Sequence, residues 1–177
     1  GLPCFIKPTD GGSSIGITKV KERSQFDAAV VSAQAEQTDA LVESFLEGTE
    51  VSCGCISIQG TPKALAVTEI VPANEFFDFE SKYTNAKTQE ITPARIDAKV
   101  YEEVMRTTEK IYSMLNGKGM IRIDFMVGKN GVYLIEPNTT PGLSEASILP
   151  QQAVYCGYDL DSFFDLSLTE MFREHSA

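Results

Sequence analysis

The segment Gly119-Met-Ile-Arg-Ile-Asp-Phe-Met-Val-Gly128-Lys-Asn-Gly131-Val-Tyr-Leu-Ile-Glu-Pro-Asn138 decides the fold of this chain. Two runs rich in apolar residues, 119–127 and 132–137, flank a short segment that contains glycines, and this pattern predicts a β-hairpin. If the turn is a three-residue loop of residues 129–131, with Gly131 in the left-handed conformation, Gly128 lies opposite Val132. That register determines which polar side chains of the two strands face each other.

The polar residues of this hairpin form a candidate metal site. The predicted register places Asp124 opposite Glu136 and Arg122 opposite Asn138, with opposed Cβ atoms ~4.5–5.5 Å apart. Two carboxylates that close, on strands made largely of apolar residues, repel each other unless a positive charge lies between them. Oxygen ligands of this kind suit Mg²⁺. A solvated outer face of an antiparallel sheet, with Arg122 as a simple ion-pair partner, is the alternative, and spacing alone does not decide between them.

The remaining chain has the hydrophobic periodicity of short strands and amphipathic helices. Predicted strands cover 2–7, 17–20, 40–46, 50–59 and 63–71, and predicted helices cover 24–36, 97–115, 148–156 and 160–173. Ser24 followed by Asp27 has the spacing of a capping box at the first helix. Strands joined by hairpins, with helices interspersed, indicate an α+β protein with antiparallel sheets and packed helices.

Three further segments carry candidate ligand-binding residues. The loop of residues 9–16, rich in glycine and hydroxyl groups, can wrap a phosphate with backbone N–H groups, and Lys7 adds a charge beside it, although an ordinary turn is the alternative. Glu43 and Glu50 flank a short turn and can accept hydrogen bonds from a ribose or an amino group, or can simply be solvated. Lys82 and Tyr83, in the aromatic segment 72–95, can close over a ligand or form an ordinary surface pair.

Composition excludes several classes of function. The 177 residues carry a formal net charge of −10, and no basic cluster extends beyond the Lys19–Arg23 segment, so nucleic-acid binding is not expected. No apolar run approaches the ~20 residues that span a bilayer, and no signal peptide is evident. Cys53 and Cys55 share one face of a predicted strand, and we interpret them as small buried thiols rather than a metal or redox pair, because no second pair or histidine accompanies them.

The motifs occur in the order and spacing of the D-alanine–D-alanine ligases, a branch of the ATP-grasp superfamily, and the chain resembles that family over essentially its whole length. The matching segments are Phe5-Ile-Lys-Pro8, Gly12-Ser-Ser-Ile-Gly16, Lys19-Val20, Leu41-Val-Glu43, Gly48-Thr-Glu-Val51, Phe77-Asp-Phe-Glu-Ser-Lys-Tyr83, Arg122-Ile-Asp-Phe125 and Glu136-Pro-Asn-Thr-Thr-Pro-Gly142 with Ser147.

This resemblance implies an ATP-grasp fold in which residues 1–45 are the remainder of the central lobe and residues 46–177 are the C-terminal catalytic lobe. The N-terminal domain and part of the central lobe are expected to be absent. The implied reaction is ATP-dependent formation of D-alanyl-D-alanine through an acyl phosphate, for peptidoglycan synthesis in the cytoplasm. The parent enzyme is expected to be a homodimer, and the fragment alone is expected to be inactive.

The resemblance also implies which residues bind the nucleotide and its metal ions. The ligands of two Mg²⁺ ions, for which Mn²⁺ is a possible substitute, correspond to Asp124, Glu136 and Asn138. The residues expected to contact ATP are Lys7, Ser14, Glu43, Glu50 and Lys82.

Catalytic and substrate-binding roles follow from the same resemblance. Arg122 corresponds to the residue that stabilises the tetrahedral oxyanion, and Ser13 with Tyr83 corresponds to the pair that closes the site. Ser147, with Gly142 in the same loop, is expected to bind the second D-alanine.

The chain departs from the family pattern at Phe77 and Phe79, where tyrosines are usual, and at Pro137, where an aliphatic residue is usual. Beside the leading function, two other functions stay open. One is a ligase with another acceptor, D-lactate or D-serine, and the other is a nucleotide-binding module without catalytic activity.

Overall fold

The computed structural model describes residues 1–10, 15–35, 38–72 and 88–173. The chain forms two compact units. The first unit contains Gly1–Glu47, and the second contains Gly48–Val71 and the chain from Gln89 onward. Each unit has its own sheet and its own buried core, so each is described by itself.

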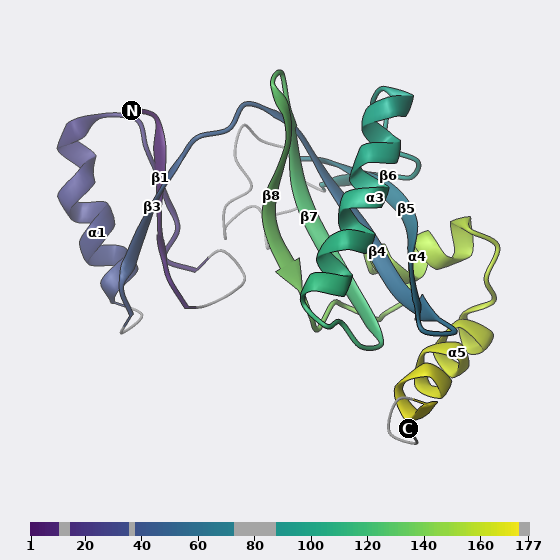
Figure 1. Ribbon diagram of the computed structural model, residues 1–177. Coiled ribbons are helices and arrows are strands. Elements are labelled where there is room, and N and C mark those ends of the chain that lie inside the picture. Colours follow the sequence, from purple (N-terminus) through teal and green to yellow (C-terminus); the bar gives the residue numbers. More distant parts are fainter. Residues whose placement is uncertain (11–14, 36–37, 73–87, 174–177) are drawn as a thin grey trace. The chain divides into compact units, whose positions relative to one another are not determined.

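The first unit is a three-stranded antiparallel sheet with one helix (Figure 1). Its elements are β1 (Cys4–Pro8), β2 (Thr18–Val20), a 3₁₀ turn (Arg23–Gln25), α1 (Phe26–Gln34) and β3 (Ala40–Ser44), with strand order β2-β1-β3. Ala29 and Ala33 of the helix pack against Cys4, Ile6 and Val20 of the sheet. The predicted hairpin of residues 2–7 and 17–20 is thus confirmed as β1 and β2.

The capping box predicted at Ser24 and Asp27 is wrong. The observed box lies two residues earlier, where Glu22 accepts from the backbone of Gln25 and the Gln25 side chain accepts from the backbone of Glu22 at 3.0 Å. Because the chain enters the helix through a 3₁₀ turn, the capping box spans that turn, from Glu22 to Gln25, rather than the first turn of the α-helix.

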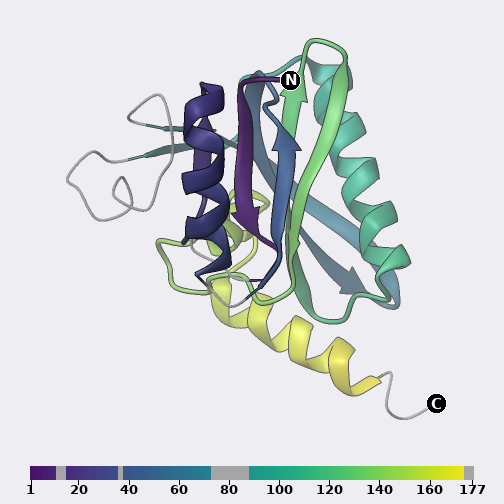
Figure 2. The ribbon, with the colours of Figure 1, turned by 90° about the vertical axis from the view of Figure 1, so that its left-hand side faces the viewer.

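The second unit is a five-stranded antiparallel sheet covered by three helices (Figures 1 and 2). Its strand order is β6-β5-β4-β7-β8. The strands are β4 (Gly48–Ile58), β5 (Thr61–Val71), β6 (Gln89–Ile91), β7 (Met120–Gly128) and β8 (Gly131–Asn138), and the helices are α3 (Ala98–Met114), α4 (Ile148–Tyr155) and α5 (Leu160–Arg173). The three helices predicted in this part of the chain are confirmed within two residues.

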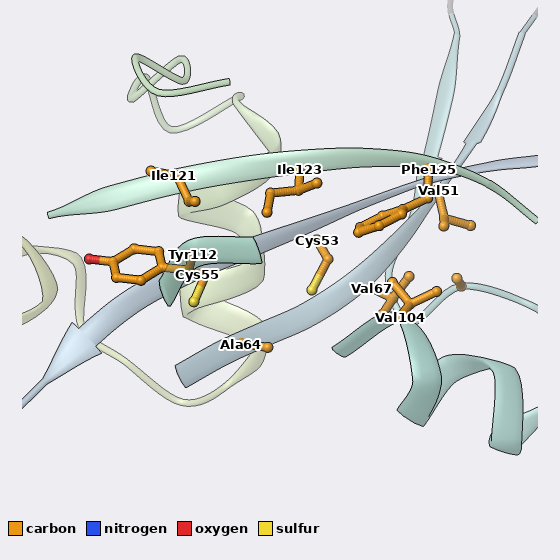
Figure 3. Close-up of a cluster of buried hydrophobic side chains, with 11 residues drawn as sticks. Val51, Cys53, Cys55, Ala64, Val67, Val104, Tyr112, Ile121, Ile123 and Phe125 are labelled. Carbon is orange, nitrogen blue, oxygen red and sulfur yellow. The ribbon is translucent and has the colours of Figure 1, made fainter. Parts of the chain in front are cut away.

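The two faces of this sheet are buried by different helices. Cys53, Cys55 and Phe125 lie in a core with Val104 and Tyr112 of α3 (Figure 3). Ile56 lies in a second core with residues of α4 and α5. Cys55 and Ile56 are neighbours on β4, and neighbouring residues of a strand point to opposite faces of the sheet. Helix α3 therefore covers one face, and α4 and α5 cover the other. Cys53 and Cys55 are buried free thiols, as expected, and burial raises the pKa of each to about 12.

The turn between β4 and β5 is shorter than predicted. Gln59 and Gly60 both have positive φ, 53° and 75°, which is the geometry of a two-residue hairpin turn. Thr61 and Pro62 therefore belong to β5, and both strands begin two residues earlier than the sequence pattern indicated.

The hairpin of β7 and β8 has the predicted ligand pairing but not the predicted turn. Gly128 pairs with Gly131, so the loop has two residues and not three. Further along, Phe125 pairs with Leu134 and Asp124 pairs with Glu136, which leaves Ile135 as the additional residue of a β-bulge. The predicted turn had one residue more than the observed turn, and the bulge contains one residue more than a regular strand. The two differences cancel, so Asp124 pairs with Glu136 and Arg122 pairs with Asn138, as predicted.

Within the described residues, no helix is long and apolar enough to cross a membrane.

Candidate functional site

The candidate site lies on the face of the second sheet that is opposite α3. Ile123 and Phe125 of β7 point into the core beneath α3. Arg122 and Asp124 alternate with them along the strand and therefore point to the other face. Glu136 and Asn138 share that face, because they pair directly with Asp124 and Arg122. The structure thus brings together the four residues predicted from the hairpin.

Asp124 is the most strongly held side chain of this group. Its Oδ1 accepts from Arg122 Nε at 3.0 Å, and its Oδ2 accepts from Arg122 Nη2 at 2.9 Å and from Asn138 Nδ2 at 2.8 Å. A fourth hydrogen bond comes from Ser52 Oγ to Oδ1, at 2.5 Å. Two carboxylate oxygens offer about four lone-pair positions, so this carboxylate is fully hydrogen-bonded and fixed in orientation.

Ser52 was missed by the sequence analysis. It is 1% exposed on β4 and pairs directly with Asp124 of β7. The sequence contains only a weak indication of this role. Ser52 follows Glu50 by two residues and so shares its face of the strand, but nothing in the local sequence indicates that β4 pairs with β7.

The charge of Arg122 is maintained by the surrounding carboxylates. Burial opposes the charged form, but hydrogen bonding to Asp124 and the charges of Asp124, Glu136 and Glu90 outweigh burial and raise the pKa of Arg122. Arg122 was also considered as a simple ion-pair partner, and in the structure it forms an ion pair with Asp124. A fixed guanidinium with a partly exposed fork is also suited to stabilising a developing oxyanion.

The donor set fits a hard divalent cation. Asp124 and Glu136 supply carboxylate oxygens, and Asn138 supplies an amide oxygen when its side chain turns over, since the amide nitrogen now donates to Asp124. Among the residues that the structure describes, no group of three or more His, Cys, Asp or Glu side chains gathers, so a cation here depends on two carboxylates and one amide. To bind Asp124, a cation has to replace one of its present donors.

The loop after β8 brings the two predicted substrate-binding residues together. A Cβ atom added to Gly142 would lie 2.7 Å from Ser147 Oγ, so only a glycine allows this approach. Ser147 Oγ also contacts Ser144 Oγ at 2.8 Å, and Ser147 is the N-terminal flanking residue of α4.

Two of the predicted ATP-binding residues are paired with each other in the first unit. Lys7 Nζ lies 2.8 Å from Glu43 Oε2, on neighbouring strands β1 and β3. Glu50 lies in the second unit, on β4, two residues before Ser52.

Several predictions fall outside the described residues. These are the catalytic predictions Ser13 and Tyr83, the ATP-binding predictions Ser14 and Lys82, and the departures Phe77 and Phe79. The departure at Pro137 is described: it lies on β8, the edge strand of the sheet, where a residue without an N–H group is tolerated.

Comparison with solved structures identifies the class of protein that this fold represents. The chain superposes on a D-Ala:D-Ser ligase, VanG, from Enterococcus faecalis with a TM-score of 0.86 and 33% identity, covering 96% of this chain and 50% of that structure. It superposes on a D-alanine–D-alanine ligase from Bacillus anthracis with a TM-score of 0.82 and 26% identity, covering 99% of this chain and 56% of that structure. The fold is that of the C-terminal half of ATP-grasp ligases.

Sequence comparison identifies the family. The family model described as D-ala D-ala ligase C-terminus matches residues 1–167, and the chain belongs to this family. A D-alanine–D-alanine ligase of Parabacteroides distasonis is 46% identical over 161 residues, which are 90% of this chain and 48% of that protein. The chain spans about half the length of the curated relatives that it matches.

Proposed function

We propose that this chain is the C-terminal catalytic part of a cytoplasmic enzyme that joins two D-alanines at the expense of ATP, for peptidoglycan synthesis. The observation that carries the proposal is the joint presence of Arg122, Asp124, Glu136 and Asn138 on one face of the β7–β8 hairpin, in a chain that belongs to the D-alanine–D-alanine ligase family. In this reaction ATP phosphorylates the carboxylate of one D-alanine and leaves as ADP; the amine of the second D-alanine then attacks the acyl phosphate, and phosphate leaves as the dipeptide forms.

Asp124, Glu136 and Asn138 would hold Mg²⁺ or Mn²⁺, in the family two ions. When bound, the metal neutralises negative charge on the phosphates during phosphoryl transfer. Ser52 Oγ donates to Asp124 Oδ1 and helps to hold the carboxylate in place. Arg122, which is paired with Asp124, would stabilise the oxyanion formed when the amine attacks.

The roles of the remaining predicted residues are also part of this proposal. Lys7 contacts the ATP phosphates, and Glu43 and Glu50 contact the adenine amino group and the ribose. Ser147 and Gly142 bind the second D-alanine. Ser13, Ser14, Lys82 and Tyr83 keep the roles that the family resemblance implies, and the enzyme is a homodimer.

The decisive experiment is phosphate release with Mg²⁺-ATP and D-alanine, D-serine or D-lactate as acceptor. It compares the 177-residue chain with a full-length ligase that contains these residues. We expect dipeptide and phosphate from the full-length enzyme with D-alanine, and none above background from the chain alone, since relatives are about twice as long. The control is Asp124→Asn in the full-length enzyme. A nucleotide-binding module would bind ATP but give no turnover in either form.

A second acceptor has one specific observation in its favour, which is the 33% identity to a ligase named for D-serine. Competition between D-alanine and D-serine in the same assay separates the two functions. Product that contains D-serine in the presence of equal D-alanine would overturn the D-alanine assignment.

A further inference from the structure

A buried polar network connects Asp124 to helix α4 through the interior of the second unit. Ser52 Oγ donates to Asp124 Oδ1, and the carbonyl oxygen of Ser52 accepts from Gln152 Nε2 at 2.9 Å. Gln152 Nε2 also donates to Thr68 Oγ1 at 2.8 Å. The strand pairs place Thr68, Ser52 and Asp124 in one row across β5, β4 and β7.

Gln152 is held in a single orientation. It is completely buried, and its Oε1 accepts from the backbone N–H of Gly54 at 2.8 Å, while its amide hydrogens face Ser52 and Thr68. Rotation of the amide would place its oxygen against the carbonyl oxygen of Ser52, which is unfavourable in a buried site.

Strand β4 is irregular at the point where Gln152 contacts it. The β4–β5 ladder shifts register between Cys53 and Cys55, and Gly54 lies at the shift. A Cβ atom on Gly54 would lie only 2.7 Å from Gln152 Oε1, so the absence of a side chain admits the glutamine. A buried donor such as the Gly54 N–H is unfavourable without an acceptor, and Gln152 supplies that acceptor.

We infer that Ser52 and Gln152 are positioning residues for the proposed metal site, and this inference rests on the proposed function. Ser52 fixes the Asp124 carboxylate, and Gln152 fixes the β4 backbone at Ser52 by bonding it to α4. The helix begins directly after Ser147, so the same glutamine connects the metal ligand with the predicted substrate-binding loop. Groups that orient a metal ligand commonly change metal affinity by about 10–100-fold when removed.

The test is the affinity of the 177-residue chain for Mn²⁺, measured from the electron paramagnetic resonance signal of free Mn²⁺. We expect Ser52→Ala to raise the Kd about tenfold, and Ser52→Thr, which keeps the hydroxyl, to restore it. Ser57→Ala, a buried serine of the same strand, is the matched control and is expected to leave the Kd unchanged. Thermal unfolding of each variant verifies folding. If Ser52→Ala does not fold, the isosteric pair Ser52→Thr and Ser52→Val isolates the hydroxyl.

Gln152→Met removes the amide at nearly constant length, and the double variant with Ser52→Ala tests the connection. We expect Gln152→Met alone to raise the Kd, and the double variant to bind Mn²⁺ no more weakly than Ser52→Ala, because the glutamine acts through Ser52. Independent, multiplying effects of the two substitutions would overturn the connection. An unchanged Kd in Ser52→Ala, together with loss of binding in Asp124→Asn, would overturn the positioning role while leaving the metal site intact. Absence of Mn²⁺ binding by the unaltered chain, or an Asp124→Asn variant that binds equally well, would instead overturn the proposed site itself.

Discussion

At the residue scale, the central feature is a carboxylate whose two oxygens accept four hydrogen bonds from protein groups. Arg122, Asn138 and Ser52 supply four hydrogen bonds to Asp124, so Arg122 compensates the charge of this carboxylate and its orientation is fixed. A cation must compete with these donors, and its affinity is therefore sensitive to any residue that changes the local charge.

Asn138→Asp tests this balance. It replaces a donor to Asp124 by a third carboxylate, so we expect the melting temperature in EDTA to fall by about 5 °C. Added Mg²⁺ is expected to recover most of the loss, because the extra charge strengthens cation binding. Calorimetry in EDTA and in Mg²⁺ measures both effects. Asn130→Asp, in the exposed turn, changes the net charge equally and serves as control. Equal behaviour of the two variants would contradict the prediction.

The cysteines give a second prediction at this scale. Cys4, Cys53 and Cys55 are buried and Cys156 is exposed, although partial burial still raises the pKa of its thiol. We expect a thiol reagent at pH 8 to label one cysteine slowly in the native protein and four after denaturation. Mass spectrometry of the labelled peptides identifies the site, and Cys156→Ser is expected to abolish native labelling. Rapid native labelling of Cys53 would contradict the described core.

At the element scale, the β7–β8 hairpin shows what sequence can and cannot predict. The alternation of apolar and polar residues predicted both strands and the face shared by Arg122 and Asp124. The turn was predicted wrongly because glycine-containing loops of two and three residues share the same residue preferences, and nothing marks Ile135 as a bulge. Ser52 and Gln152 were missed because their roles depend on contacts between distant parts of the chain, which local periodicity does not specify.

Shortening β8 tests the role of the bulge. Deletion of Ile135 leaves a regular ladder with Asp124 still opposite Glu136, so we expect Mn²⁺ affinity to stay within about threefold of the unaltered chain. Deletion of both Leu134 and Ile135 turns Glu136 and Asn138 to the α3 face, and we expect the Kd to rise at least about tenfold. The same Mn²⁺ titration measures both variants. Equal affinities would show that the register does not govern the site.

Another element-scale prediction concerns the segment that leads from β6 into α3. Arg95 donates from its Nε and Nη2 to Glu69 of β5 at 2.8 and 2.9 Å. These hydrogen bonds hold the pKa of Glu69 below its ordinary value of 4.5. The stabilisation is therefore complete above about pH 4.5 and is lost as the pH falls through the lowered pKa.

We expect Arg95→Gln to lower the melting temperature by about 2–5 °C at pH 7, and the difference from the unaltered chain to shrink as the pH falls below 4.5. Thermal unfolding followed by circular dichroism from pH 3 to 7 measures this. Arg106→Gln removes an exposed ion pair with Glu102 and is expected to change little at any pH. A pH-independent difference for Arg95→Gln would exclude Glu69 as the cause.

At the scale of the whole molecule, the chain consists of two units with very different cores. Among the described residues, the core of the first unit has five buried hydrophobic residues, while the second unit buries an extended sheet on both faces. Small units bury a smaller fraction of their surface and are correspondingly less stable. The α+β class was predictable from the order of elements, but the position of β4 in the centre of the second sheet was not, since it depends on pairing with β7.

Hydrogen exchange tests this difference. We expect backbone amides of β1 and β3 to exchange faster than those of β4 and β7, because local opening follows the amount of buried surface. Exchange followed by mass spectrometry at pH 7 resolves the strands. Ile6→Ala is expected to increase exchange in β1–β3 alone, and Ile123→Ala to do so in the second unit alone. Uniform protection across all four strands would mean that the units unfold as one.

The bulge at Ile135 also affects how relatives of this chain can be recognised. A hairpin with a three-residue turn and a regular β8, one with a two-residue turn and a bulge, and one that lacks the additional residue altogether all pair the same aspartate with the same glutamate. The additional residue can lie in the turn, lie in the strand as a bulge, or be deleted, and the pairing of the two carboxylates stays the same. A search that demands a fixed number of residues between the two carboxylates would therefore overlook proteins in which the geometry of the site is fully preserved.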